Sequence, residues 1–522
     1  MSALPGQGNM QKEVLNAVDW LRGHAQSNAQ LHADTRSLKI GDVFLAYAVD
    51  GADNRPYLDA ALNAGAACAL YQPKNFASHS DASKTLAVKA LNELAGPIVA
   101  AWYGEPSASM LTVGVTGTNG KTSCSTWIAT ALSALGCPCA IVGTLGIGFP
   151  AKLAHTGFTT PDAPQLQRNL AQLKREGAEC VAMEVSSHAL HQGRVNGVDF
   201  DIGIFTNLTQ DHIDYHGTFD AYEAAKARLF AWPTLKTAIV NRDDAAGQRL
   251  IESLRGKVRT IAYGVKMPAS AAPSADTMLL ASHVRATATG TAFHLSSDWG
   301  EAEVEVGTLG TFNMSNLLAV LGVLLEIGVP FDAAIASTTK LESVNGRMEC
   351  LGGRDEPLVV IDYAHTPDAL DKTLVALRPI AQARGGKLIC MFGCGGDRDA
   401  KKRPLMGEIA ERLADQLVIT SDNPRSEEPM SIIDQITVGM KDASRSRRIE
   451  DRASAILQAI RCAAREDVVV LAGKGHETTQ EVMGKKRTFS DQDHARLALA
   501  ARATQPQSPS QISQTLQRGG TK

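Results

Sequence analysis

The chain has 522 residues, 44% of them hydrophobic and 20% charged, with a formal net charge of −3. This composition is typical of a globular protein and excludes a disordered or fibrous class. The small net charge and the lack of a basic run argue against nucleic acid or an anionic membrane surface as a partner, so a small molecule is expected.

The sequence also carries signs of its compartment. Its start lacks the basic segment and apolar core of a secretory signal. The most apolar later stretch, residues 317–329, contains Glu326 and is shorter than the ~20 residues that span a bilayer. The nine cysteines lack paired spacing and fit reduced thiols. We therefore expect a cytoplasmic protein without membrane insertion, and a monomer.

Length suggests about three domains, at about 100–200 residues each. A helix-like run ends near Tyr103, and the turn formers that follow it mark the first boundary. About the first ten residues and the tail lack apolar periodicity and are predicted to be loose or disordered. The expected divisions are 1–108, 109–350, 351–503 and a tail at 504–522.

Alternating strand-like and helical patterns predict an α/β fold. Short apolar runs separated mostly by helix-length segments indicate a mostly parallel sheet in the central domain and a second α/β unit in the C-terminal domain. A β-branched stretch at 278–307 is predicted to form a few antiparallel strands. The expected parallel strands are 111–116, 140–142, 181–185, 202–206 and 237–241, then 358–362, 387–392, 416–420 and 467–471.

A glycine-rich loop follows the first central strand and precedes a predicted helix from Ser123. This order of strand, loop and helix N-terminus is typical of a phosphate site. Lys121 supplies a point charge and Thr122 a hydroxyl for Mg²⁺. The alternative, a glycine-rich turn with a solvated lysine, would not explain why strand, loop and helix follow one another in this order. The residues of the loop are Gly117, Thr118, Asn119, Gly120, Lys121 and Thr122.

The loop departs from the general phosphate-loop pattern at Val115, where a glycine is expected. With Gly114-Val115-Thr116 before it, the loop instead resembles the ATP loop of the Mur ligases. Similar blocks follow in the family's order, and with later motifs they cover nearly the whole chain. These blocks are 183–188 (MEVSSH), 207–212 (NLTQDH), 310–316 (GTFNMSN) and 362–367 (DYAHTP).

The resemblance implies a fold and a reaction. It implies an N-terminal UDP-binding α/β module, a central ATPase-like domain with a mostly parallel sheet, and a Rossmann-like C-terminal domain that binds an amino acid. The most similar members add the third residue of the peptidoglycan stem peptide to UDP-MurNAc-L-Ala-D-Glu. The implied reaction forms an amide bond through an acyl-phosphate, with ATP and Mg²⁺ as cofactors.

The resemblance also implies roles around the phosphate loop. Glu184 stands at the end of the predicted strand 181–185 and His212 follows the predicted strand 202–206, so both are expected at the carboxyl edge of the sheet, where such sheets bind ligands. With Thr122 they are implied as Mg²⁺ ligands. His212 alone, however, could equally be structural.

Lys226 lies in Tyr222–Phe230, a segment that resembles the family motif whose lysine is carbamylated. On an amphipathic helix a lysine is usually a solvated charge. As a carbamate, Lys226 would be an anion able to hold a second Mg²⁺. The modification needs a neutral amine, so burial would favour it.

Asn316 matches the family's adenine-contacting asparagine, although as a single residue it could be only a polar group near a helix start. Arg347 and Asp362 match residues that close over the nucleotide. Closure of the C-terminal domain would then exclude water from the acyl-phosphate.

Contacts to the sugar nucleotide and dipeptide are implied in two regions. In the N-terminal domain Ser37 is the expected UDP contact, whereas Asp50 departs from the family's residue and leaves its surroundings open. Each polar residue of the second region could instead cap a helix or turn. The dipeptide contacts are Thr159, Thr160, Ser186, Gln192 and Arg194.

The C-terminal domain is expected to select the amino acid. Family members that add meso-diaminopimelate carry Asp-Asn-Pro-Arg, found here at 422–425, and lysine-adding relatives lack this arginine. Arg425 suits a distal carboxylate, although it could be a surface ion-pair residue. The implied contacts are Arg398, Asp422, Asn423, Pro424, Arg425, Gly473 and Glu477, the last pairing with an ammonium.

Two other functions remain as alternatives. A lysine-adding ligase would not require Arg425. A regulatory protein that uses ATP to change shape would hydrolyse it without UDP-MurNAc-L-Ala-D-Glu, and would give Glu184, His212 and Lys226 little reason to occur together. The glycine run at 392–396 lacks the spacing of a dinucleotide fingerprint and is set aside.

Overall fold

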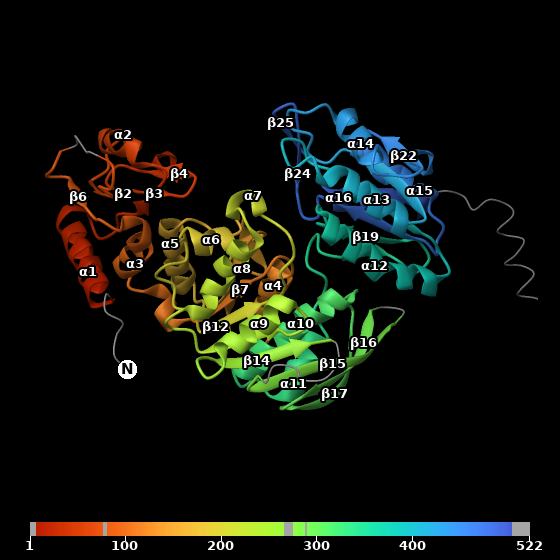
Figure 1. Cartoon of the computed structure of the whole chain (residues 1–522), viewed down its shortest axis with the longest axis horizontal. Coiled ribbons are helices and arrows are strands. Elements are labelled where there is room, and N and C mark those ends of the chain that lie inside the picture. Colours follow the sequence, from red (N-terminus) through yellow and green to blue (C-terminus); the bar gives the residue numbers. More distant parts are fainter. Residues whose placement is uncertain (1–6, 77–80, 266–274, 288–289, 504–522) are drawn as a thin grey trace, which may run out of the picture. The chain divides into compact units, whose positions relative to one another are not determined.

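The computed structural model describes residues 7–76, 81–265, 275–287 and 290–503 (Figure 1). The tail predicted to be disordered, 504–522, lies outside these residues. The chain divides into two compact units. The first runs to Val284 and also takes in Ala292–Val306 and Phe312–Leu341. The second is built mainly from the residues that follow Glu342, with Arg285–Thr291 and Gly307–Thr311.

The N-terminal region is a small parallel sheet with helices against it. Its strand order is β1-β2-β5-β6. Helix α1 begins at Gln7, so the prediction that about the first ten residues are loose is wrong for residues 7–10. The reason is an apolar face: Ala17, Val18 and Leu21 recur at helical spacing and are buried. The elements are α1 (Gln7–His24), β1 (Leu31–His32), β2 (Val43–Ala46), α2 (Leu58–Asn63), β5 (Cys68–Tyr71), β6 (Thr85–Ala87) and α3 (Leu91–Trp102).

The central sheet has the order β10-β9-β8-β11-β7-β12-β13-β14-β15-β16-β17. Its pairs from β8 to β15 are parallel, and β8, β9 and β10 pair antiparallel. The predicted parallel strands are present, some with ends that differ by one residue. The strands are β7 (Leu111–Thr116), β8 (Cys139–Gly143), β9 (Gly146–Phe149), β10 (Lys152–Ala154), β11 (Cys180–Glu184), β12 (Ile202–Phe205), β13 (Thr237–Asn241), β14 (Arg259–Gly264), β15 (Thr277–Ala286), β16 (Thr291–Ser297) and β17 (Gly300–Val306).

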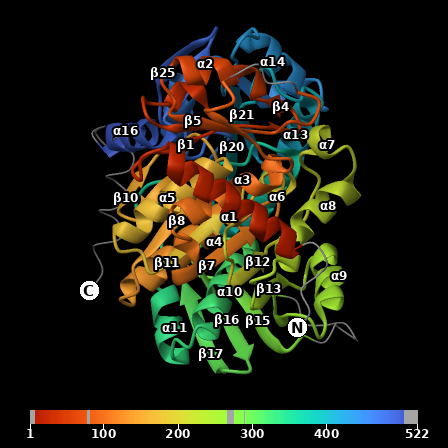
Figure 2. The same ribbon diagram turned by 90° about the vertical axis from the view of Figure 1, so that its left-hand side faces the viewer.

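Helices cover this sheet, which is why its strands are continuous apolar runs rather than alternating ones. Helix α4 packs against β7, β8 and β11, next to which Figure 2 shows it. Most of the apolar stretch 317–329 lies in α10, which is buried over most of its length. The helices of this region are α4 (Lys121–Ala134), α5 (Ala163–Arg175), α6 (Ser187–His191), α7 (Ile213–His216), α8 (Phe219–Ala227), α9 (Ala245–Leu254), α10 (Thr311–Glu326) and α11 (Phe331–Thr338).

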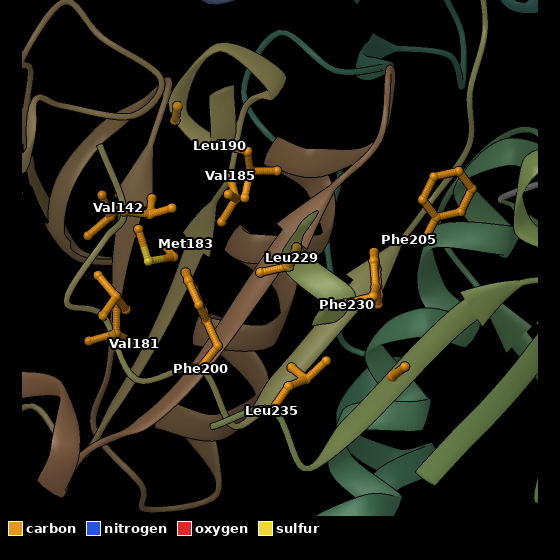
Figure 3. Close-up of a cluster of buried hydrophobic side chains, with 14 of the residues drawn as sticks. Val142, Val181, Met183, Val185, Leu190, Phe200, Phe205, Leu229, Phe230 and Leu235 are labelled. Atoms are coloured by element: carbon orange, nitrogen blue, oxygen red, sulfur yellow. The ribbon is translucent and has the colours of Figure 1, made fainter. Parts of the chain in front are cut away.

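An apolar cluster of the central region includes residues of β11 and of the segments that pack on this strand. Figure 3 shows Val181 and Met183 of β11 beside Phe200, with Leu229 and Phe230 next to them. All five side chains are buried. Close packing here fixes the position of this strand, and with it the direction in which the residues at its carboxyl end point.

The N-terminal and central regions of the first unit meet backbone to backbone. A Cβ added to Gly96 of α3 would lie 1.9 Å from the carbonyl O of Asn196, and one added to Gly197 would lie 2.7 Å from Gly96. Arg168 of α5 also donates a hydrogen bond to the carbonyl of Leu31, at 3.1 Å. These contacts hold the two regions together.

The second unit has a sheet in the order β18-β19-β23-β20-β21-β22, parallel except for the β18–β19 pair. A separate two-stranded hairpin, β24–β25, was not predicted. The strands are β18 (Glu349–Gly352), β19 (Leu358–Asp362), β20 (Leu388–Phe392), β21 (Gln416–Thr420), β22 (Ser446–Ile449), β23 (Val468–Ala472), β24 (Thr479–Val482) and β25 (Lys485–Thr488); the helices are α12 (Pro367–Arg384), α13 (Lys402–Leu413), α14 (Pro429–Thr437), α15 (Arg452–Cys462) and α16 (Asp491–Ala503).

No helix within the described ranges is long and apolar enough to cross a membrane.

Candidate active site

Three neighbouring parallel strands end at the same edge of the central sheet. In the order β11-β7-β12, they lead to Glu184, to the glycine loop at 117–122 and to Asn207. The carboxyl edge of a parallel sheet is where such folds bind ligands. The strand order therefore brings the predicted phosphate loop and the predicted metal ligand Glu184 together.

The glycine loop has a backbone that side chains would disturb. Gly117 has φ 143°, and a Cβ there would lie 1.9 Å from Thr206 Oγ1. The loop is pinned from β12, because Asn119 donates its backbone N–H to Asn207 Oδ1 at 3.0 Å. The Lys121 ammonium lies over the loop and donates to the carbonyl of Gly117 at 3.0 Å. This arrangement suits a polyphosphate.

Glu184 is a buried carboxylate with several donors, only 1% exposed. Thr122 Oγ1 donates to it at 3.0 Å, and Thr144 donates both its backbone N–H, at 2.8 Å, and its hydroxyl, at 3.2 Å. Oxygen ligands held in this way fit a hard cation such as Mg²⁺. Sequence analysis did not single out Thr144, although it follows the predicted strand 140–142.

Lys226 is a buried lysine rather than a solvated one. Its side chain is 2% exposed, and Nζ donates to the same Gly117 carbonyl as Lys121, at 2.8 Å. Nζ also lies 4.5 Å from the centre of the Tyr222 ring. Burial, together with the positive charge of Lys121, lowers the pKa of Lys226 well below its ordinary value. The structure therefore favours a neutral amine at this position.

His212 stands at the start of α7 with φ 55°. Its ring meets the ring of His188 edge-on at 4.8 Å, and burial lowers its pKa. Across the described ranges, no three acidic, histidine or cysteine side chains are grouped as a metal site. Of the predicted Mg²⁺ ligands, Thr122 and Glu184 are hydrogen-bonded to each other, and the ligand roles of His212 and of carbamylated Lys226 stay predictions.

The predicted nucleotide residues fall into two groups. Asn316 of α10 lies against the glycine loop, since a Cβ on Gly120 would be 2.3 Å from its Oδ1. Arg347 and Asp362 belong to the second unit. There the Arg347 guanidinium lies 4.5 Å from the centre of the Tyr363 ring, and burial raises the pKa of Asp362. Their role in closing over a nucleotide stays a prediction.

The predicted dipeptide contacts form one cluster around the end of β11. Thr160 donates its hydroxyl to the carbonyl of Glu184, at 2.8 Å, and accepts the backbone N–H of Ser186, at 3.3 Å. Arg194 donates to the carbonyl of Thr160, at 3.1 Å, and to Gln192 Oε1, at 2.8 Å. Thr159 joins this cluster through a 3.0 Å hydrogen bond between its hydroxyl and that of Thr144.

A pocket of about 630 Å³ lies between the N-terminal and central regions of the first unit. Gln192 Nε2 donates to the carbonyl of Asp50 at 3.3 Å and to the hydroxyl of Tyr215 at 3.0 Å, joining both sides. Ser37 is in the short turn Thr35–Ser37, where it donates to the carbonyl of Asp34 at 3.0 Å; its UDP contact stays a prediction. The pocket lining includes Asp50, Arg55, Lys74, Asn92, His191, Gln192, Arg228 and Trp232.

The predicted amino-acid contacts also come together, within the second unit. Asn423 donates to Glu477 Oε2 at 2.8 Å, and a Cβ on Gly473 would lie 2.6 Å from Asp422 Oδ2. Gly395 lies between the two predicted arginines, because its Cβ would be 3.0 Å from Arg425 Nη1 and 3.7 Å from Arg398 Cγ.

The residues that support this cluster were not among the predicted site residues. Lys474 is fully buried and donates to Glu477 at 2.8 Å and to Asn423 Oδ1 at 3.2 Å. The hairpin β24–β25 also contacts this cluster, through Gln480 Nε2, which donates to the carbonyl of Asp422 at 2.7 Å. The available signal for Lys474 was its position directly after Gly473 and three residues before Glu477; the hairpin had none.

Comparison with known proteins identifies the family. Residues 115–324 match the Mur ligase middle domain, and residues 346–475 match the Mur ligase glutamate ligase domain. UDP-N-acetylmuramoyl-L-alanyl-D-glutamate--2,6-diaminopimelate ligase of Ralstonia nicotianae is 57% identical over 93% of this chain and 96% of its own length.

Solved structures agree. A structure of UDP-N-acetylmuramoyl-L-alanyl-D-glutamate--2,6-diaminopimelate ligase is 35% identical, with a TM-score of 0.65, over 91% of this chain and 95% of that one. MurF ligase from Thermotoga maritima in complex with ADP is 17% identical, with a TM-score of 0.59, over 91% of this chain and 98% of that one, and shares the fold. With the glycine loop, Glu184 and the buried Lys226 in place, the chain belongs to the Mur ligase family.

Proposed function

We propose that this protein is an ATP-dependent ligase that joins meso-diaminopimelate to the D-Glu γ-carboxylate of UDP-MurNAc-L-Ala-D-Glu, as a cytoplasmic monomer in peptidoglycan precursor synthesis. The observation that carries the proposal is the convergence of Lys121, Glu184 and Lys226 on one strand edge, with Arg398 and Arg425 together in the second unit. The name of the Ralstonia nicotianae relative supports the same substrates.

The first chemical step transfers a phosphoryl group. A γ-carboxylate oxygen of D-Glu attacks the γ-phosphorus of ATP, ADP leaves, and an acyl-phosphate forms. The loop amides and Lys121 stabilise the negative charge on the phosphate oxygens. A Mg²⁺ ion held by Thr122, Glu184 and His212, and a second one held by carbamylated Lys226, would supply additional charge neutralisation.

The second step forms the amide. The amine nitrogen of diaminopimelate attacks the carbonyl carbon of the acyl-phosphate, the carbon–oxygen bond to phosphate breaks, and the nitrogen loses a proton. Arg425 and Arg398 would bind the distal carboxylate, which lysine lacks, and Glu477 would pair with an ammonium. The chain needs no covalent nucleophile for this chemistry.

The sugar nucleotide is proposed to bind the first unit. The pocket of about 630 Å³ offers Arg55, Lys74 and Arg228 to a diphosphate, and side-chain amides to a base or sugar. Ser37 is proposed as a further UDP contact. Arg194 and its cluster at the end of β11 would grip the dipeptide, next to Glu184.

The deciding experiment is phosphate release by the purified protein with ATP, Mg²⁺ and UDP-MurNAc-L-Ala-D-Glu. Meso-diaminopimelate, L-lysine and no amino acid are compared. Release that depends on diaminopimelate, with UDP-tripeptide as product, is expected. Stimulation by lysine would make lysine, rather than diaminopimelate, the amino acid of the proposed reaction. Phosphate release that depends neither on the UDP substrate nor on an amino acid would indicate an ATP-driven switch.

Carbamylation of Lys226 has its own test. The neutral amine attacks CO₂ and loses a proton, giving a carbamate. Native mass spectrometry in bicarbonate buffer should show a mass increase of one CO₂ that Lys226→Met abolishes and Lys236→Met, at an exposed lysine, retains. Full activity in CO₂-depleted buffer, with no such adduct, would contradict the carbamate.

A further inference from the structure

Arg403, at the start of α13, is a buried charged residue, with 1% of its side chain exposed. It forms a bidentate pair with Glu427, donating from Nη1 at 2.7 Å and from Nη2 at 2.8 Å. It also donates to the carbonyl of Gly395 at 3.0 Å and to Gln435 Oε1 at 2.8 Å. A buried guanidinium is tolerated only with partners of this kind.

Glu427 connects Arg403 to the two loops that carry the predicted arginines. Its Oε1 also accepts the backbone N–H of Asp397, at 2.7 Å, in the loop that contains Arg398. Glu427 itself follows Arg425 by two positions. Arg403 holds the pKa of Glu427 down at about 2, so the carboxylate keeps its charge throughout the neutral range.

The loops themselves touch through their backbones. Gly396 donates its N–H to the carbonyl of Asn423 at 2.9 Å, and a Cβ on Gly396 would lie 1.9 Å from the carbonyl O of Pro424. Arg425 Nη1 donates to the carbonyl of Gly396 at 2.7 Å. A shift of either loop would therefore move both arginines.

The hairpin fixes the backbone of Arg425 from the other side. Arg425 donates its N–H to the carbonyl of Glu481 at 3.1 Å, and its own carbonyl accepts the N–H of Met483 at 2.6 Å. These bonds hold Arg425 at φ 53°, a conformation unusual for a residue with a side chain. A backbone held in this way places its guanidinium in one region of space.

We propose that Arg403 and Glu427 are positioning residues for amino-acid selection. Their ion pair holds the loop of Arg398 against the loop of Arg425, so that both guanidinium groups are presented together to the distal carboxylate of the incoming amino acid. A guanidinium binds carboxylate through a planar fork, so its direction matters as much as its charge. The inference rests on the proposed function and adds a source of its specificity.

The test compares substitutions at the pair with a matched arginine. Arg403→Met removes the ion pair with Glu427. Arg403→Lys keeps the positive charge but cannot form the bidentate contact, and Glu427→Gln keeps the size of the side chain but not its negative charge. The control is Arg448→Met, whose partner Asp434 is exposed at a 2.9 Å ion pair in the same unit. KM is measured separately for meso-diaminopimelate, ATP and UDP-MurNAc-L-Ala-D-Glu.

For Arg403→Met we expect KM for diaminopimelate to rise about 10-fold or more, because small displacements of positioned groups cost up to about 100-fold. KM for ATP and for the UDP substrate should change less than about 2-fold, and the preference for diaminopimelate over lysine should fall. Arg403→Lys and Glu427→Gln should lie between this variant and the parent, and Arg448→Met should match the parent.

Equal losses for all three substrates, or an unchanged KM for diaminopimelate in a folded Glu427→Gln variant, would overturn the positioning role. Glu427→Gln keeps the inference testable if Arg403→Met does not fold. Failure of the proposed function looks different, because the unsubstituted protein would then show no diaminopimelate-dependent phosphate release.

Discussion

The phosphate loop and the amino-acid loop at 422–425 both follow parallel strands, but different contacts hold them. Residues 117–122 are shaped by their own glycines and by neighbouring strands, with Thr206 and Asn207 one strand away. The amino-acid loop is held by Arg403, by Glu427 and by the hairpin β24–β25, from other parts of the second unit. In the proposed reaction, the phosphate groups that all ATP-dependent ligases bind would meet local backbone, whereas the carboxylate that distinguishes diaminopimelate would meet long arginine side chains held by contacts from elsewhere in the unit.

The largest effect is expected for Gly117→Ala, in the glycine loop at 117–122. The added Cβ would lie 1.9 Å from Thr206 Oγ1 and φ is 143°, so the loop must move. We expect a loss of product formation of about 100-fold or more. Gly136→Ala is the matched control, because Gly136 also has positive φ, 88°, but nothing within 4 Å of its Cβ. Comparable losses in both variants would show that strain, rather than the contact with β12, explains the effect.

Glu184→Gln tests the charge at the same strand edge. The amide would bring its N–H₂ toward the backbone N–H of Thr144 and lose the negative charge that suits Mg²⁺. We expect activity to fall about 10–100-fold and half-maximal activity to need more Mg²⁺. Glu179→Gln, at an exposed glutamate before β11, should leave both unchanged. An unaltered Mg²⁺ requirement in Glu184→Gln would argue against a ligand role.

Arg425→Lys tests the supported loop. Lysine keeps the charge but loses the fork, so the ratio of kcat/KM for diaminopimelate over lysine should fall on the order of 10-fold, about 1.4 kcal/mol. KM for the UDP substrate should stay within about 2-fold. Competition assays with both amino acids measure the ratio directly, and an unchanged ratio would remove Arg425 as the selector.

The smallest expected effect concerns acid stability. The folded pKa of Glu427 is depressed to about 2 from its ordinary 4.5. Its contribution to stability is therefore fully present above about 4.5, declines as pH falls, and is lost near 2. Relative to the parent, Glu427→Gln should lower Tm by about 2–4 °C at pH 7 and by progressively less below pH 4. A Tm difference independent of pH down to 2 would mean that the charge of Glu427 contributes nothing.

Sequence predicted the parts of the molecule that depend on local pattern. The runs 111–116 and 237–241 became β7 and β13 with the same bounds, because strands buried on both faces are continuous apolar segments. The glycine loop was recognisable because phosphate binding needs small residues before a helix. Asn316 lies against this loop in the structure, and its predicted contact with adenine stays a prediction.

The supporting contacts could not be predicted in this way. Arg403 and Glu427 are 24 positions apart, and neither lies in a sequence pattern that distinguishes an ion pair between two loops from a surface charge. Strand β24, Thr-Gln-Glu-Val, is short and polar, and it is defined by its partner β25 and by Arg425 rather than by its own residues. Likewise, only the fold shows that Lys226 is buried against Gly117.

The contact between Gly96 and the Asn196-Gly197 turn limits how this protein can be altered. Each backbone occupies the space in which the other would place a side chain, so enlargement on one side cannot be offset by a smaller residue on the other. Substitutions at Gly96 and at Gly197 are therefore not independent of each other. A chimera that exchanges the N-terminal region with that of a relative would have to bring α3 and the turn after α6 from the same parent.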